Sequence, residues 1–382
     1  MNPCERRLVG QALADVVAEA RGGGSGIRIG LTAFGGELGQ RELLQGAREA
    51  MRRDPRLRVV AIGPRPTDFD DLSWIETSPC ESEVFQAMES ALASQEIAGA
   101  LALHYPFPVG VATAGRIVTP ARGRQLYLAS TTGALAQGRA EVMLENALLG
   151  LAVAKSQGVE DPSLGILNLD GAPQALRALR ELKERGYPVR FGESSRPEGG
   201  PILRGNDLID PHVDVCVCDT LTGNLLTKLF AGFSSGGLET QGAGYGPSMG
   251  LGWNKVISIV SRASCAPVVA NALLFCAGAV RSGLPELVKK EFEAARAAGL
   301  DQVRSSLGSG RPAGPDVPVP PAHPVDAQIP GVDVLDMESA LRALWKEGIY
   351  AESAMGCTGP VLRVKGGDEE RSRAALARAG YL

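Results

Sequence analysis

The run from Ala351 to Pro360 presents one thiol among small residues near the end of the chain. Gly356 and Gly359 flank Cys357 and Thr358, so the backbone can turn tightly with little side-chain bulk near the sulfur. A thiol in such a setting can attack a carbonyl carbon and carry the acyl group as a thioester. A free cysteine is also often a small buried core residue, and the loop alone leaves both interpretations open.

A group of hydroxyl side chains follows a predicted strand at residues 125–129. Ser130, Thr131, Thr132 and Gly133 stand between this strand and a predicted helix, a position that places hydroxyls and backbone N–H groups at the carboxyl edge of a sheet. Donors of this kind bind phosphate or stabilise an oxyanion. A helix-capping turn uses the same residue types and is the alternative.

Two further predicted strand ends carry polar side chains. Ser261 and Arg262 follow a strand at 256–260, where a guanidinium can bind phosphate bidentately or can simply be a surface cation. Thr222 and Asn224 follow a strand at 213–218 and can contact a substrate or cap the next helix. We expect the strand ends to face one crevice.

The glycine-rich stretch at 242–252 precedes a strand and lacks the lysine of a P-loop, so we predict a mobile loop bordering that crevice. Cys216 and Cys218 share one face of an apolar strand and are expected to be core residues.

Composition limits the classes of function. The 382 residues carry a formal charge of −4 and no long basic run, which argues against binding nucleic acid or an anionic membrane. The absence of a long apolar stretch and of a signal-peptide pattern favours a cytoplasmic protein. Seven cysteines without a C-x-x-C motif, and three widely separated histidines, give no support for a metal site or a cofactor other than substrate phosphate.

Short β-branched runs alternate with helical patterns from residue 27 to about residue 300, which predicts an α/β fold with a doubly wound, mainly parallel sheet. Four segments follow from this pattern and from composition. They are an N-terminal helix with a glycine linker (1–26), the α/β core (27–304), a proline-rich linker or strap (305–332) and a small α+β appendage carrying Cys357 (333–382).

Four segments resemble, in order, the phosphate acyltransferase (PlsX-like) family: 29–36, 130–135, 164–169 and 213–224. The resemblance covers roughly residues 27 to 300. It implies a fold similar to phosphotransacetylase and the isocitrate/isopropylmalate dehydrogenase-like enzymes, and formation of an acyl phosphate from an acyl thioester and phosphate. Ser261 and Arg262 look like the Ser-Arg pair of phosphotransacetylases, which implies a role at the thioester carbonyl or the phosphate.

The chain departs from the lipid-synthesis members, because their Gly-Asn-Thr-Gly is Ser130–Gly133 here and they lack the appendage. With its appendage, the chain resembles the alpha subunits of protein C in glycine/sarcosine/betaine reductase complexes, most specifically at 348–361 and at 261–271, which ends in Asn271. That resemblance implies that Cys357 carries an acyl group before phosphate releases it as acetyl phosphate.

The same resemblance implies protein partners: a ketosynthase-like beta subunit, and a protein that delivers an acyl or carboxymethyl group. An oligomer is expected. Two alternatives stay open, namely an acyl-ACP:phosphate acyltransferase of lipid synthesis and a docking subunit without turnover.

Overall fold

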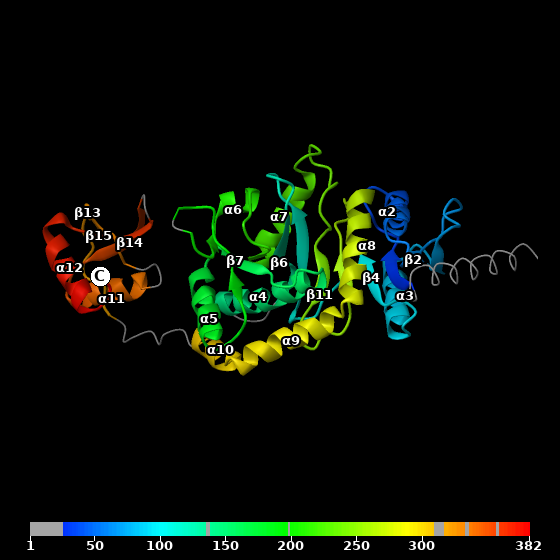
Figure 1. Ribbon diagram of the computed structural model, residues 1–382. Coiled ribbons are helices and arrows are strands. Elements are labelled where there is room, and N and C mark those ends of the chain that lie inside the picture. The colour runs from blue at the N-terminus through cyan, green and yellow to red at the C-terminus, as the bar shows by residue number, and fades with distance from the viewer. Residues whose placement is uncertain (1–25, 135–137, 198, 309–316, 333–335, 357–358) are drawn as a thin grey trace, which may run out of the picture. The chain divides into compact units, whose positions relative to one another are not determined.

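The computed structural model describes residues 26–134, 138–197, 199–308, 317–332, 336–356 and 359–382 (Figure 1). The chain divides into two compact units, Met1–Gly308 and Ser309–Leu382, each with its own hydrophobic core. The predicted N-terminal helix and Cys357 lie outside the described residues.

The described part of unit 1 is built on one twelve-stranded mixed sheet. In spatial order its strands are β3 (Ser73–Glu76), β2 (Leu57–Gly63), β1 (Ile27–Thr32), β4 (Gly99–Ala102), β12 (Ile257–Ile259), β11 (Gly246–Met249), β5 (Val111–Val118), β6 (Gln125–Ala134), β10 (Val215–Val217), β7 (Ser163–Leu167) and β8 (Arg190–Phe191), and β9 (Ile202–Leu203) also pairs with β7.

The sheet consists of two parallel blocks joined by antiparallel strands. From β3 to β12 every pairing is parallel, and so is every pairing from β6 to β8. Three antiparallel pairings, β12 with β11, β11 with β5 and β5 with β6, separate the blocks. Since each antiparallel pairing reverses direction, the two blocks run in opposite directions.

Helices cover both faces of this sheet, as a doubly wound fold requires (Figure 1). The helices of unit 1 are α2 (Gln40–Arg53), α3 (Glu81–Ala93), α4 (Arg139–Ser156), α5 (Ala172–Glu184), α6 (Gly205–Ile209), α7 (Thr220–Gly232), α8 (Ala266–Arg281), α9 (Leu284–Ala297) and α10 (Leu300–Gly308).

Side-chain alternation along the strands divides the core between the two faces. Tyr127 and Ala129 of β6 pack in the large cluster with α2, α4, α5, α8 and α9. The alternate residues Leu126 and Leu128 pack with Leu226 and Phe230 of α7, while α3 covers the same face of β2 and β4. Thus α3 and α7 share one face, and β11 and β12 lie between the strands they cover.

The sequence correctly predicted the α/β class and most helices of unit 1, but it was wrong in the middle of the sheet. The stretch at 242–252, predicted to be a mobile loop, contains β11, whose four residues are buried. Gly246 permits this because its φ is +81° and a Cβ there would lie 1.8 Å from the Ala114 carbonyl oxygen. The strand β5, next to it, was not predicted.

Unit 2 contains a three-stranded antiparallel sheet, β13 (Ala327–Ile329), β15 (Gly359–Val364) and β14 (Ala351–Gly356), with α11 (Met337–Lys346), a short 3₁₀ turn (Gly366–Asp368) and α12 (Glu369–Arg378). Leu344, Leu362 and Leu376 are among its fully buried residues. The segment predicted as a loop around Cys357 therefore belongs to two paired strands, with Gly356 opposite Gly359.

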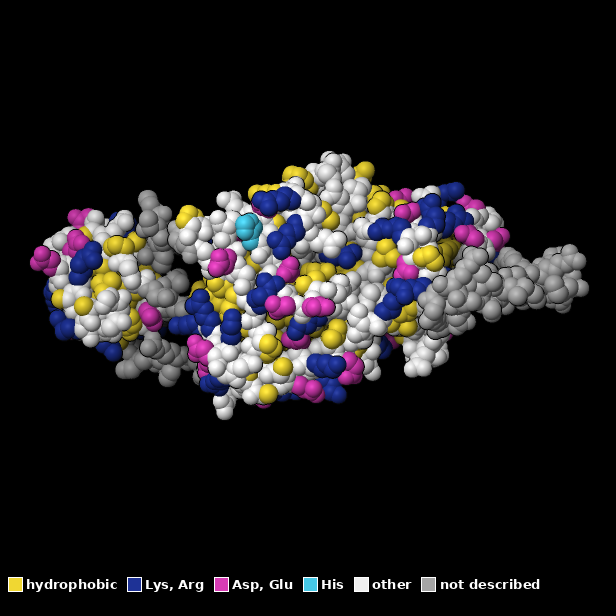
Figure 2. All heavy atoms as spheres, in the orientation of Figure 1, with side chains coloured by type: hydrophobic (Ala, Val, Ile, Leu, Met, Phe, Trp, Pro, Cys, Tyr) yellow, Lys and Arg dark blue, Asp and Glu magenta, His cyan; other side chains and the backbone are white. Residues whose placement is uncertain are grey.

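Among the described residues, no single helix has the length and hydrophobicity needed to cross a membrane. The bent pair α8 and α9, which meet at 60°, satisfies those two criteria only when taken together. Acidic and basic side chains are intermixed on the face shown in Figure 2, without a broad field of one sign.

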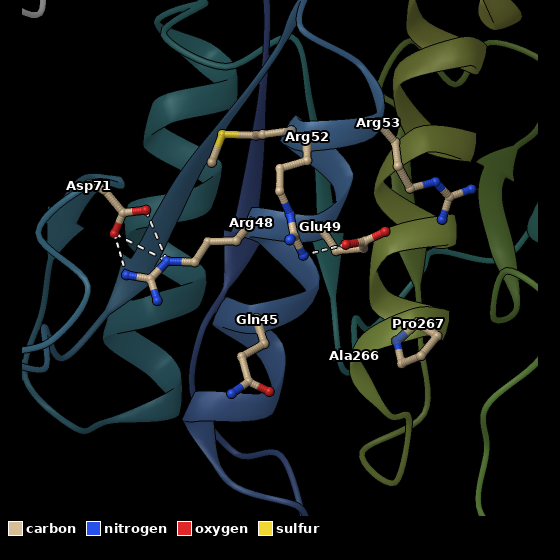
Figure 3. Close-up of a pocket in the computed structure, with 9 residues that line it drawn as sticks. Gln45, Arg48, Glu49, Arg52, Arg53, Asp71, Ala266 and Pro267 are labelled. Atoms are coloured by element: carbon tan, nitrogen blue, oxygen red, sulfur yellow. Dashed lines mark hydrogen bonds and ion pairs between the residues drawn. The ribbon is translucent and has the colours of Figure 1, made fainter.

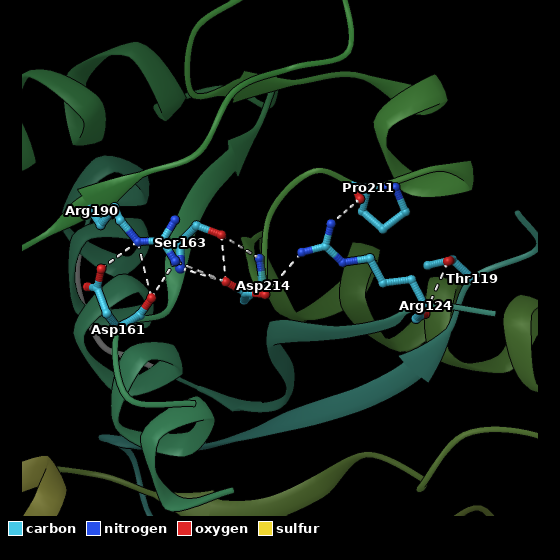
Figure 4. Close-up of polar contacts among 7 residues, drawn as sticks. All are labelled: Thr119, Arg124, Asp161, Ser163, Arg190, Pro211 and Asp214. Carbon is cyan, nitrogen blue, oxygen red and sulfur yellow. Dashed lines mark hydrogen bonds and ion pairs between the residues drawn. The ribbon is translucent and has the colours of Figure 1, made fainter. Parts of the chain in front are cut away.

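A cluster of polar side chains links Asp214, the residue before β10, to neighbouring strands by hydrogen bonds (Figure 4). Asp214 accepts hydrogen bonds from the Ser163 amide (2.8 Å) and hydroxyl (2.6 Å) and from Arg124 (3.1 Å). Burial alone would raise the pKa of Asp214, but the Ser163 donors and Arg124 outweigh it and lower the pKa below its usual range.

We predict that Asp214→Asn lowers the free energy of unfolding at pH 7 by about 2 kcal/mol, because charge-assisted hydrogen bonds to a partly buried group are lost. The stabilisation is present above the unfolded-state pKa and is lost as pH falls through the lower folded-state pKa. Denaturant titrations of both proteins should therefore converge below about pH 4. Asp161→Asn is the control, since Asp161 is 69% exposed and its ion pair with Arg190 should contribute less than about 0.5 kcal/mol.

Candidate functional site

The first predicted group, Ser130 to Gly133, lies within β6 and not after it. The strand continues to Ala134, so the prediction of a strand-to-helix turn was wrong. Ser130 and Thr131 are fully buried, whereas Thr132 and Gly133 are half-buried. Threonine suits a strand as well as a turn, because its branched side chain packs on a pleated surface.

Threonine hydroxyls join β6 to β5 and to the residue before β11. The Thr113 hydroxyl lies 2.8 Å from the hydroxyls of both Thr131 and Thr132. Thr131 also donates to the Tyr245 carbonyl at 2.6 Å. This network holds three strands together, and it leaves Thr132 as the member nearest to solvent.

Ser130 belongs to a second, buried network at the start of α7. Its hydroxyl lies 3.1 Å from that of Thr220 and accepts a hydrogen bond from the Asn146 amide at 3.3 Å. The same amide donates to the Cys218 carbonyl at 3.1 Å, while the carbonyl oxygen of the Asn146 side chain is buried and has no hydrogen-bond partner among the described residues. Ser130 therefore positions the end of β10 and the start of α7.

The two residues predicted after β10 have different roles. Thr222 donates its amide (3.0 Å) and hydroxyl (2.6 Å) to Asp219, which caps α7. Asn224, one turn into the helix, donates to the Thr131 carbonyl at 3.3 Å and so ties α7 to β6. Thr222 is thus engaged in capping, and Asn224 lies beside the threonine network.

The Ser261–Arg262 pair follows β12 as predicted, but the two side chains have different neighbours. Arg262 is 44% exposed and pairs with Glu81 of α3 at 2.7 Å. Ser261 is buried and accepts a hydrogen bond from Lys228 of α7 at 3.3 Å. The guanidinium is therefore already bound by a carboxylate, whereas the serine faces a cation.

The expectation that the strand ends share one edge was wrong. Because β6 and β12 run in opposite directions, their carboxyl ends lie at opposite edges of the sheet. Helix α7 connects the two regions instead, since Asn224 contacts Thr131 and Lys228 contacts Ser261. These residues are four apart and lie on the same side of the helix.

Sequence reasoning missed the residues around Lys228. Its ammonium lies 3.5 Å from Glu239, whose other carboxylate oxygen accepts from the Ser264 hydroxyl at 3.0 Å. The Tyr245 side chain lies near both Lys228 and Ser261 and interacts electrostatically with the lysine. One sequence signal was available: Lys228 is the single charged residue between Thr220 and Gly232, beside a predicted strand end.

Electrostatics keep these groups in defined protonation states. Burial raises the pKa of Tyr245, and Lys228 only partly offsets this, so the phenol stays protonated at neutral pH. Burial would lower the pKa of Lys228, but Tyr245 and Glu239 raise it above its usual value, so the lysine stays charged. The cluster combines a fixed positive charge with hydroxyl donors, as an anion site requires.

Asn271 lies away from this cluster, in the middle of α8. It accepts from Arg53 of α2 at 2.8 Å and donates to the Gly242 carbonyl at 2.8 Å. Arg53 also lines an open depression of about 710 Å³ on α2 and the start of α8, where Arg48 pairs with Asp71 and Arg52 with Glu49 (Figure 3). Asn271 therefore supports the segment leading to Tyr245.

The position of Cys357 relative to these residues is not defined, because Cys357 lies outside the described residues and belongs to unit 2. Four of the five described cysteines are poor nucleophiles. Burial raises the pKa of Cys216 to about 12 and of Cys276 to about 11, and it also raises the pKa of Cys218 and Cys265. Within the described ranges, no group of His, Cys, Asp or Glu could hold a metal ion.

Comparison with known proteins shows similarity along nearly the whole chain. A family model described as "Fatty acid synthesis protein" matches residues 27–363. The chain is 41% identical over 384 residues to the glycine/sarcosine/betaine reductase complex component C subunit alpha of Peptoclostridium acidaminophilum, with 99% of each chain covered.

Two matches of lower identity are named as a phosphate acyltransferase and a phosphotransacylase. A phosphate acyltransferase of Brucella suis is 26% identical over 247 residues, which cover 54% of this chain and 70% of the relative. Among solved structures, a branched-chain phosphotransacylase from Enterococcus faecalis superposes with a TM-score of 0.47 at 16% identity, covering 66% of this chain and 99% of that one.

Proposed function

Because the chain belongs to the fatty acid synthesis protein family, which is the PlsX-like family, we propose that it is an acyltransferase that transfers an acyl group to inorganic phosphate within a reductase complex. The observation that carries this proposal is the 41% identity to the component C alpha subunit over 99% of both chains. The match includes unit 2, whereas the match to the phosphate acyltransferase of Brucella suis covers 54% of this chain.

The proposed reaction has two steps. The Cys357 thiolate first attacks the carbonyl carbon of an acyl thioester donor, the donor C–S bond breaks, and the donor leaves as its thiol with the Cys357 proton, so that the acyl group is held on Cys357 as a thioester. An oxygen of hydrogen phosphate then attacks the thioester carbonyl carbon, the C–S bond breaks, and the phosphate proton passes to the departing thiolate. The products are an acyl phosphate, which we propose to be acetyl phosphate, and the free thiol.

The described residues can support the second step in two ways. Thr132 and Gly133 lie at the solvent side of the threonine network and are proposed to bind the oxyanion that forms when the carbonyl is attacked. Ser261 lies beside a lysine and is proposed to bind phosphate. No additional base is needed, since hydrogen phosphate is itself a nucleophile at neutral pH.

Two protein partners belong to this proposal: a ketosynthase-like beta subunit of the same complex, and a protein that delivers the acyl or carboxymethyl group. The word "complex" in the relative's name supports the existence of partners. Gel filtration of the chain co-expressed with the beta subunit should give a single peak larger than either chain alone. Separate elution of the two chains would contradict the proposed pairing.

A second candidate function is acyl transfer from acyl-ACP to phosphate in lipid synthesis. The family description and the 26% identity to a phosphate acyltransferase favour it. In that reaction the thioester belongs to the carrier, so turnover would not depend on Cys357.

The full chain should be incubated with phosphate and either a short-chain acyl thioester or a long-chain acyl-ACP, and acyl phosphate trapped as the hydroxamate. We expect hydroxamate from the short-chain donor, in proportion to the phosphate present. Product from long-chain acyl-ACP alone would favour the lipid pathway. No product from either donor, with or without the beta subunit, would contradict acyl transfer.

A further inference from the structure

We propose that phosphate binds on the α7 side of Ser261, that Lys228 is its principal cation, and that Glu239 occupies this site when phosphate is absent. The inference rests on the proposed function for the identity of the anion. It adds Lys228 and Glu239, which neither the family description nor the sequence motifs indicate, to the Ser261 already proposed.

The first argument is that the Glu239 carboxylate already sits where an anion would. One of its oxygens lies 3.5 Å from the Lys228 ammonium, and the other accepts from the Ser264 hydroxyl at 3.0 Å. A phosphate oxygen can accept hydrogen bonds from the same lysine ammonium and serine hydroxyl groups. The Glu239 side chain is 12% exposed, so its carboxylate lies largely out of water at this position.

The second argument compares the two cations near Ser261. Arg262 is bound by Glu81 at 2.7 Å, the length of a direct charge-assisted hydrogen bond. The distance of 3.5 Å between Lys228 and Glu239 is longer than such a bond, so this pair is the looser of the two. An incoming dianion can therefore displace Glu239 from Lys228 more readily than it can displace Glu81 from Arg262.

The third argument concerns how the site is positioned. Ser261 and Tyr245 are buried at 8% and 6% exposure; the Ser261 hydroxyl accepts a hydrogen bond from Lys228, and the Tyr245 side chain lies near the same lysine. Lys228 itself is 48% exposed in its side chain, so the ammonium is reachable from solvent. A buried pair of hydroxyls beneath an accessible cation orients phosphate oxygens on one side and leaves the others for reaction.

The fourth argument is the link to the threonine network. Asn224 and Lys228 are one helical turn apart on α7, and Asn224 is bonded to the carbonyl of Thr131, which precedes Thr132. Helix α7 therefore links the proposed phosphate site to the threonine network through two side chains on the same side of the helix.

The test is the dissociation constant for inorganic phosphate, measured by calorimetry on the full chain without an acyl donor. We expect Lys228→Met to weaken binding by roughly 10- to 100-fold, as the loss of a charged hydrogen bond predicts. Lys228→Arg should stay within about 3-fold because the charge is kept. Glu239→Gln should tighten binding by about 3- to 10-fold, because the competing carboxylate is removed.

Two further variants sharpen the result. Arg262→Met should weaken phosphate binding less than Lys228→Met does. Lys183→Met, on the exposed side of α5, is the matched control for loss of a lysine and should leave the constant unchanged. Unchanged binding in Lys228→Met, a larger effect of Arg262→Met, or no phosphate binding by the unaltered chain would each overturn the inference.

The calorimetry separates this inference from the proposed function, since it needs no turnover. If phosphate binds through Lys228 but no acyl phosphate forms with any donor, the proposed function fails and the site stands. If acyl phosphate forms and Lys228→Met leaves the KM for phosphate unchanged, the function stands and the site assignment fails. Circular dichroism of each variant verifies that the fold is kept.

Discussion

Cys357→Ser is expected to lower acyl phosphate formation by roughly 10³-fold or more, the order seen when a covalent nucleophile is removed. A serine hydroxyl is a far weaker nucleophile than a thiolate at neutral pH, and the ester it would form is less reactive than a thioester. Rates should be measured with the short-chain donor at saturating phosphate. Phosphate affinity should remain unchanged in this variant.

Mass spectrometry provides the direct observation. In phosphate-free buffer the unaltered chain should gain one acyl group on Cys357, and added phosphate should remove it. An acyl adduct absent from Cys357, or full activity in Cys357→Ser, would reject the thioester mechanism.

Cys80 provides the matched control for this experiment. It is partly exposed, and hydrogen bonds from Ser82 and from the backbone N–H groups of Ser82 and Glu83 lower its pKa. It is therefore the described thiol that would react most readily with an acyl donor without regard to function. Cys80→Ser should keep full activity, and an adduct confined to Cys80 would identify the labelling as incidental.

Gly223→Ala is expected to destabilise unit 1 by about 3 kcal/mol, the upper part of the range for inserting a methyl group into a packed core. A Cβ at this position would lie 1.9 Å from the Ser130 carbonyl oxygen. Because a backbone atom cannot rotate aside, α7 or β6 must move. Thermal and denaturant unfolding give the stability, and acyl phosphate formation should fall with it because Asn224 and Lys228 move as well.

The sign of this effect is informative, because alanine normally stabilises a helix by up to about 1 kcal/mol over glycine. Gly205→Ala, at the start of α6 with no atom within 4 Å of the added Cβ, is the control and should be neutral or slightly stabilising. Equal or greater stability of Gly223→Ala would show that α7 does not approach β6 as closely as described.

The sequence was sufficient for the fold class because long helices with buried, regularly spaced apolar residues can be recognised without tertiary information. Helix α5 is an example, because its buried residues Ala175, Leu176, Leu179 and Leu182 recur at helical spacing. The strand β11 was not recognisable in the same way, since Gly246, Pro247 and Ser248 have low strand propensity. Its place in the sheet depends on close backbone contacts that only the folded chain provides.

The sequence predicted only part of the candidate site, and the reason for the failure is related. Hydroxyls at Ser130 to Thr132 and at Ser261 can be seen in the sequence, but strand direction cannot, so two opposite edges were taken for one. The contact between Lys228 and Ser261 joins residues 33 apart and depends on how α7 crosses the sheet. A lysine on a helix that also exposes Leu221, Leu225 and Leu229 gives little local sign of that role.

The four-residue interval between Asn224 and Lys228 fixes the distance along α7 between two contacts, one to β6 and one to the residue that follows β12. Loops that connect a site can lengthen or shorten during evolution, but the rise of an α-helix is fixed by its hydrogen bonds. The spacing between the contact to the Thr131 carbonyl and the contact to Ser261 is therefore set by helix pitch. Insertions in the loops around the sheet would leave the spacing between these two contacts unchanged.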